Sequence, residues 1–152
     1  MLDLANYLPY LLNRAGSRIA ADFSRAVKSY GITLPVWRVL VALHHQNGQR
    51  VGELAELTAI EVSTLSRVLD LMQRQGLVKR HRLATDSRSV AVHLTVAGRS
   101  LTRRIMPLAQ SYETAALAGF SAAETMTLKA MLQRLYLNMD RLPAARRLRR
   151  SA

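Results

Sequence analysis

The chain of 152 residues contains no cysteine. Disulfide bonds, thiolate metal ligands and cysteine-based oxidation sensing are therefore excluded. Long apolar runs are also missing, because Arg14, Arg18, Asp22 and Arg25 interrupt the first candidate helix well short of the ~20 residues that span a bilayer. The N-terminal segment carries Asp3 and lacks the basic start and small-residue cleavage site of an export signal. We expect a soluble protein, and a reducing cytoplasm fits this composition.

Acidic residues are scarce, with 10 Asp and Glu against 22 Lys and Arg and a formal net charge of +12. Such an excess predicts a polyanionic partner, either nucleic acid or an anionic membrane surface. Apolar residues make up 49% of the chain and charged residues 21%, which is not the composition of a disordered protein. The length suits one domain of roughly 100 to 200 residues. We therefore expect a single domain over residues 1–152.

Patterns that carry catalysis are absent as well. The sequence shows no Ser-His-Asp order, no paired carboxylates and no phosphate-cradling loop. The four histidines are not spaced as a ligand set: His44, His45, His81 and His93. We predict no enzymatic activity, no metal site and no cofactor.

Apolar residues recur at three- and four-residue steps over most of the chain, which predicts helices. The expected helices cover residues 9–28, 34–46, 51–58, 62–76, 95–118 and 122–142. Gly31 should close the first, Thr33 should cap the second, and Ser121 with Glu124 should form a capping box for the last. Pro107 should kink the fifth helix.

Two short strands are predicted between the fourth and fifth helices. Val90, Val92 and Leu94 alternate with smaller or polar residues, a period of two that indicates one buried face. The order of elements predicts a mainly α fold with a small β-hairpin wing, in which residues 33–95 form a winged helix-turn-helix. Residues 143–152 are interpreted as a basic tail.

The fourth helix is the predicted recognition helix. Its buried stripe is expected to consist of Val62, Leu65, Val68, Leu69 and Met72. The opposite face carries the candidate DNA contacts, which are Ser63, Thr64, Ser66, Arg67 and Arg74. Short polar residues at a helix start also serve as caps, so helix capping is the alternative for the first of them. Glu61 precedes the helix, where an acid favours the helix dipole.

Positive charge concentrates around the hairpin. Eight Lys or Arg residues and a single acid, Asp86, lie between Arg74 and Arg104. An arginine at an extended tip can enter the narrow minor groove of A·T-rich DNA, and Arg88 is the candidate. Asp86 is close enough in sequence to hold the Arg88 guanidinium extended. An Asx turn, with Asp86 bonding its own backbone, is the alternative, and the two roles can coexist.

Three segments in this order resemble the MarR family of transcriptional regulators, and the likeness covers residues 8–142. "GITLPVWRVLVAL" is similar to the family's second helix and "LAELTAIEVSTLSRVLDLMQRQGLVKR" to its helix-turn-helix. "DSRSVAVHLTVAGR" is similar to its wing and to the start of the following helix. The wing pattern, an Asp and an Arg followed by Leu-Thr, is the most specific of the three.

The resemblance implies a homodimeric repressor that binds a pseudo-palindromic DNA operator and responds to a small molecule. Residues 8–30 and 96–142 would form the dimerisation helices, and the surplus apolar surface of the first and last helices independently calls for a partner. By the same resemblance Arg88 is the wing arginine and Asp86 its orienting partner. Lys79, Arg80 and Arg82 are expected to contact phosphates, giving affinity without sequence choice.

The effector site is expected in a cleft between the dimerisation helices and the winged region. Its candidate residues are Tyr10, Leu11, Arg14, Arg18, Trp37 and His44. An aromatic acid or its CoA thioester would suit Trp37 beside an arginine, and "LPYLLNRAG" is similar to regulators of hydroxycinnamate and other aromatic-acid catabolism. The alternative is that Trp37 belongs to the core and the arginines to the surface. At the level of function, the alternative is a winged-helix module that binds a protein instead of DNA.

Overall fold

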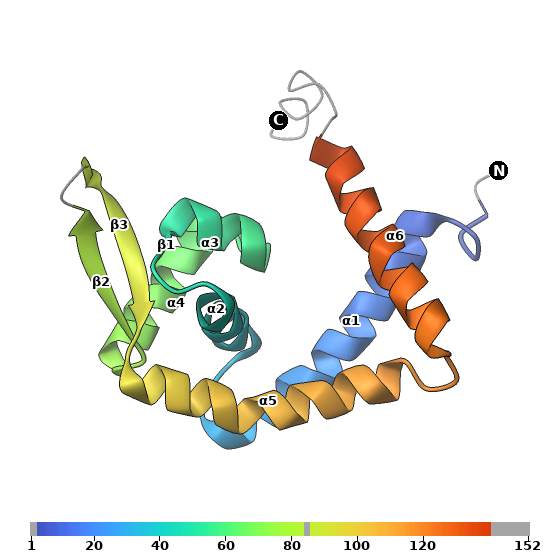
Figure 1. The fold of residues 1–152 in the computed structure, drawn as a ribbon, viewed down its shortest axis with the longest axis horizontal. Coiled ribbons are helices and arrows are strands. Elements are labelled where there is room, and N and C mark those ends of the chain that lie inside the picture. Colours follow the sequence, from blue (N-terminus) through green and yellow to red (C-terminus); the bar gives the residue numbers. More distant parts are fainter. Residues whose placement is uncertain (1–2, 84–85, 141–152) are drawn as a thin grey trace. The chain divides into compact units, whose positions relative to one another are not determined.

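The computed structural model describes residues 3–83 and 86–140. The described residues form six α-helices and a small sheet (Figure 1), which confirms the predicted mainly α fold with a wing. In chain order the elements are α1 (Leu8–Val27), a 3-10 turn (Lys28–Tyr30), α2 (Leu34–His45), β1 (Gln49–Arg50), α3 (Val51–Thr58), α4 (Val62–Arg74), β2 (Val78–Leu83), β3 (Asp86–Leu94), α5 (Val96–Ala116) and α6 (Ala122–Asp140). The chain divides into two compact units, residues 1–112 and 113–152, and each is described by itself.

The helix boundaries follow the predicted caps with one exception. Gly31 ends the first helical segment in the left-handed region at φ 73°. Ser121 and Glu124 form the expected capping box, in which each backbone N–H donates to the other side chain, at 2.7 and 3.2 Å. Thr33 stands at the N-cap of α2 in extended conformation, but its side chain accepts no capping hydrogen bond. Pro107 lies inside α5, which continues beyond it to Ala116.

The sheet has three antiparallel strands in the order β1-β3-β2, one more than predicted. β2 pairs with β3 so that Arg80 lies opposite Val92, and Gln49 of β1 lies opposite Val92 on the other edge. Ala91 is buried as well as Val92, although the alternation predicts only one buried face. Ala91 pairs with a residue on each side, in β1 and in β2, and its short side chain is covered by these neighbours.

The core of the first unit forms around α2. Five of its residues are buried and His44 is exposed; the buried residues are Val36, Trp37, Val39, Leu40 and Leu43. These residues do not all fall on one face of the helix, so α2 is enclosed on more than one side. Phe23 of α1 joins this core, with its ring centroid 5.7 Å from that of Trp37 and 5.3 Å from that of Tyr112 on α5.

The start of α5 is hydrogen-bonded to the residues that precede β2. The Thr95 hydroxyl donates to the carbonyl of Gly76 at 2.6 Å and accepts from the Gly98 N–H at 3.0 Å. Gly98 is buried, and a Cβ atom placed on it would lie 2.2 Å from the Leu77 carbonyl oxygen. The two backbones approach so closely here that no side chain fits between them.

The second unit contains α6, which is joined to the end of α5 by an ion pair between Lys129 and Glu113 at 2.5 Å. Its large apolar side chains remain exposed in the single chain: Met126, Met131, Leu132, Tyr136, Leu137 and Met139. This agrees with the expected surplus of apolar surface on the last helix.

No single helix of the described chain is long and apolar enough to cross a membrane. Residues 8–30 and 34–45 meet the length and composition criteria only as a pair, and that pair is bent by 84°.

Candidate nucleic-acid interface

The turn between α3 and α4 fixes the start of the predicted recognition helix. Ala59 adopts a left-handed conformation with φ 52°, which costs an L-residue with a Cβ atom roughly 1 to 2 kcal/mol. The turn is closed by the Ile60 N–H, which donates to the Ala55 carbonyl at 3.2 Å. Glycine, which has no Cβ atom, would adopt this conformation at lower cost than Ala59 does.

The buried stripe of α4 determines which of its side chains face solvent. Leu65, Leu69 and Met72 are fully buried at steps of four and three residues. The opposite face is exposed and carries all five predicted contacts of this helix: Ser63, Thr64, Ser66, Arg67 and Arg74. The prediction that Val62 is buried is wrong, because it lies in the first turn, where the buried stripe runs out, and 53% of it is exposed.

Glu61 caps α4. Its carboxylate accepts from the backbone N–H groups of Ser63 and Thr64, at 2.9 and 3.2 Å, and from the Ser63 hydroxyl. These hydrogen bonds, first that of the Ser63 hydroxyl, and the nearby Arg67 charge lower the pKa of Glu61. The Ser63 hydroxyl is thus engaged in the cap, whereas Thr64 uses its backbone and keeps its side chain exposed.

Glu61→Gln should lower the stability of the folded protein at neutral pH, and should lower it less in acid. Because the folded-state pKa is lowered, the carboxylate's contribution is present above about pH 4.3, the ordinary value for glutamate, and is lost as pH falls through the lowered pKa. Urea unfolding at pH 7 should show a lower midpoint for the variant than for the parent. At pH 3.5 the difference between the two midpoints should be smaller. Glu56→Gln, which alters an exposed acid on α3, is the control; an unchanged difference for Glu61→Gln would contradict the charged cap.

The basic residues of β2 differ in how far they are exposed. Lys79 and Arg82 are exposed, and among the described residues neither forms an ion pair. Arg80 is only partly exposed and lies opposite buried Val92. The side chains of Asp86 and Arg88 lie outside the described part of the structure, so their pairing at the wing tip stays a prediction.

Arg80 is turned toward α4. Its Nη1 lies 2.7 Å from a carboxylate oxygen of Asp70, and its Nη2 donates to the Ser66 carbonyl oxygen at 3.1 Å. The sequence reasoning did not single out Asp70. The available signal was an acid on the same helix as Arg67 and Arg74, four residues after Ser66.

The predicted effector residues are not gathered in one place. Trp37 is part of the core, 7% exposed and packed on Phe23, as its alternative interpretation had it. Arg14 lies over the ring of Tyr10, 5.5 Å from its centroid, on the exposed part of α1. Leu11 is exposed on the same helix, Arg18 pairs with Asp22 at 3.7 Å, and His44 is exposed near the end of α2.

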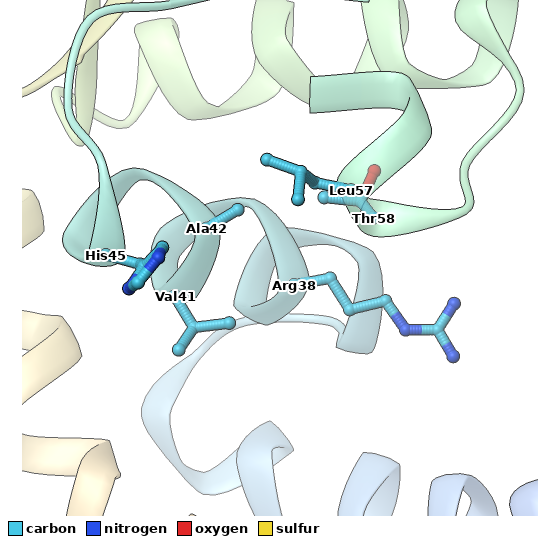
Figure 2. Close-up of a pocket in the computed structure, with 6 residues that line it drawn as sticks. All are labelled: Arg38, Val41, Ala42, His45, Leu57 and Thr58. Carbon is cyan, nitrogen blue, oxygen red and sulfur yellow. The ribbon is translucent and has the colours of Figure 1, made fainter. Parts of the chain in front are cut away.

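A hollow of about 350 Å3 lies elsewhere, between α2 and α3. Figure 2 shows its lining residues. Ala42 of α2 faces Leu57 and Thr58 of α3, and Arg38 and His45 lie toward opposite ends of α2. None of the six predicted effector residues lines this hollow.

Comparisons with known proteins agree with this arrangement. Residues 30–89 match the model of the MarR family. The chain is 30% identical over 128 residues to an HTH-type transcriptional repressor of Mycobacterium tuberculosis, covering 84% of this chain and 92% of that protein. The crystal structure of a MarR-family transcriptional regulator from Silicibacter pomeroyi has a TM-score of 0.83 and 32% identity, with 93% of this chain and 94% of that one covered.

A further solved structure is that of Bordetella bronchiseptica BpsR, described in a study of how 6-hydroxynicotinic acid regulates its DNA binding. Its TM-score is 0.76 at 26% identity, covering 85% of this chain and 98% of that one. The likeness to these regulators extends over nearly the whole chain, in sequence and in fold, and includes the helix-turn-helix and the wing. The chain belongs to the MarR family of transcriptional regulators.

Proposed function

We propose that the protein is a homodimeric repressor that binds a pseudo-palindromic operator through α4 and the wing. The observation that carries the proposal is the orientation of α4. Burial of Leu65, Leu69 and Met72 leaves its polar face exposed, next to a basic strand. A helix presented in this way can enter the major groove with its first residues against base edges. The similarity to a mycobacterial transcriptional repressor supports the same role.

The exposed cations supply the affinity. Arg67, Arg74, Lys79 and Arg82 are exposed, and no ion pair engages them within the described residues. Unpaired cations of this kind neutralise phosphates and release counterions, which gives tight but sequence-independent binding. Thr64, Ser66 and Arg67 at the start of α4 are proposed to contact base edges, and Arg88 to probe the minor groove.

Dimerisation is supported by apolar surface that the single chain leaves uncovered. Leu8, Leu11 and Ile19 are exposed on α1, and six large apolar side chains are exposed on α6. A two-fold symmetric pair is the commonest way to bury such faces. It would also present two recognition helices to successive major grooves about 34 Å apart, which fits a palindromic site.

The effector is proposed to be an aromatic acid or its CoA thioester. BpsR, which is similar over most of this chain, has its DNA binding regulated by 6-hydroxynicotinic acid, an aromatic acid. On this chain, Arg14 and Tyr10 offer a cation beside an aromatic ring on the exposed face of α1. Arg14 is therefore the residue proposed to receive the carboxylate, and Trp37 is not, because it is buried in the core.

A salt titration of duplex binding tests the proposed function. An operator is first selected from random duplexes, and its affinity is then measured between 50 and 300 mM salt. We expect log affinity to fall linearly with log salt with a slope of about −0.9 for each phosphate neutralised.

The effector proposal is tested on the same operator. Added 6-hydroxynicotinate should weaken operator binding by the parent, and the Arg14→Gln variant should show a smaller loss of affinity.

Two outcomes would overturn the proposal. Weak binding that does not change with salt would favour a winged-helix module that binds a protein. If the protein bound at the selected operator raised transcription from an adjoining promoter, it would be an activator and not a repressor.

A further inference from the structure

Arg80 holds two elements together. It projects from β2 of the wing, and both of its terminal nitrogens bond to α4: Nη1 to the Asp70 carboxylate at 2.7 Å and Nη2 to the Ser66 carbonyl at 3.1 Å. Only 26% of its side chain is exposed. No partner for its Nε is found among the described residues, and that atom is buried. The side chain is thus withdrawn from solvent between the strand and the helix.

Its position in the sheet explains this orientation. Successive side chains of a strand point to opposite faces, so Arg80 shares the face of buried Val78 while Lys79 points the other way and is exposed. Arg80 also lies directly opposite Val92 in the fully buried part of β3. The guanidinium therefore leaves the sheet on the side where α4 packs.

Arginine suits such a link better than lysine. Its planar guanidinium presents several N–H donors in a fixed fork, so it can bond a carboxylate and a carbonyl in two directions at once. Asp70 and Ser66 are four residues apart, one turn of α4. One arginine thus bonds to adjacent turns of the helix whose exposed face carries Ser66 and Arg67.

We propose that Arg80 and Asp70 form a positioning pair, which sets the wing strand against the recognition helix and thereby promotes operator binding without contact with DNA. The inference rests on the proposed function, since the interface it positions is the proposed DNA-binding surface. It also replaces the expectation that Arg80 contacts phosphate. A cation with two partners inside the protein would have to give them up to reach DNA.

The two roles predict opposite effects of Asp70→Asn. The substitution removes one negative charge near DNA, so electrostatics alone would strengthen binding to every duplex. If Arg80 contacted phosphate, the loss of its competing partner would strengthen binding further. If the pair positions the wing, affinity for the selected operator falls while affinity for unrelated DNA does not.

The experiment measures the parent, Asp70→Asn, Arg80→Gln and Arg80→Lys, each on the selected operator and on an unrelated duplex, over a range of salt. We expect both charge-removing variants to lose operator affinity on the order of fivefold to tenfold, typical of coupling within one side-chain network. Their salt slopes should match that of the parent. Arg80→Lys should rescue only part, because an ammonium cannot reproduce the fork.

Lys79→Gln is the matched control, one residue away on the same strand and exposed. It should weaken binding to both duplexes and make the slope shallower by about 0.9, as expected for a phosphate contact. Circular dichroism spectra and melting curves show whether each variant is folded. If Arg80→Gln does not fold, Asp70→Asn and Arg80→Lys carry the test, and if Asp70→Asn does not fold, the two Arg80 variants carry it.

Stronger operator binding by Asp70→Asn, or a slope for Arg80→Gln that is shallower by about 0.9, would overturn the positioning role and leave the proposed function intact. Failure of the parent and of Lys79→Gln to bind any duplex would instead overturn the proposed function, and the pair's role with it.

Discussion

Replacing Leu132 and Tyr136 of α6 by aspartate is expected to turn the dimer into monomers and to reduce operator affinity by at least about a hundredfold. The two side chains lie one turn apart on α6 and are 41% and 60% exposed in the single chain. Burying two carboxylates in an apolar contact costs far more than the contact returns. Operator affinity falls because, in a dimer, binding of one subunit holds the second at high effective concentration near its half-site. A monomer has no such advantage.

Light scattering gives the mass in solution, and the selected operator gives the affinity. Gln133→Asp adds an acid at an exposed polar position of the same helix and should leave both unchanged. If the double variant stayed dimeric and bound normally, α6 would not form the proposed interface. If it became monomeric without losing affinity, the two half-sites would not be bound together.

Gly98→Ala is expected to destabilise the fold by about 2 to 3 kcal/mol, within the range for forcing an extra carbon into a packed core. A Cβ atom would lie 2.2 Å from the Leu77 carbonyl oxygen and 3.1 Å from the Leu94 side chain. The Leu77 oxygen cannot move away without cost, because it accepts a hydrogen bond from the Thr95 N–H at 3.0 Å. Alanine's better helix propensity, worth about 1 kcal/mol at most, does not offset this.

Thermal unfolding should show a melting temperature lower by roughly 5 to 10 °C. Gly52→Ala is the matched control, since Gly52 also lies in the first turn of a helix and has nothing within 4 Å of an added Cβ atom. It should be neutral or slightly stabilising. Equal melting temperatures for Gly98→Ala and the parent would show that α5 and β2 can move apart without cost.

The sequence was sufficient for elements whose signals are local. Each helix shows its period of three to four residues within its own length, and the turn residue Gly31 and the pair Ser121 and Glu124 stand next to the helices they cap. The two-residue strand β1 has no such signal. It forms because Gly48 and Gln49 lie beside Val92, more than forty residues later in the chain.

The candidate site was predictable only in part for the same reason. The exposed face of α4 follows from its buried stripe, which the sequence shows. The partner of Arg80 does not, since an arginine in a basic hairpin suits a phosphate as well as it suits Asp70, and only the packing of β2 on α4 decides. Trp37 had the same ambiguity, and its contact with Phe23 resolves it in favour of the core.

The outer strands of the sheet also bear on how copies of this protein behave when no DNA is bound. An unpaired strand edge is a template on which another chain can add a strand and start aggregation. Here one edge is β1, only two residues long, and the other is β2, which carries the exposed cations Lys79 and Arg82. A short edge and a positively charged one both oppose strand addition. The charge proposed to attract the operator would thus also keep free wings from pairing with one another.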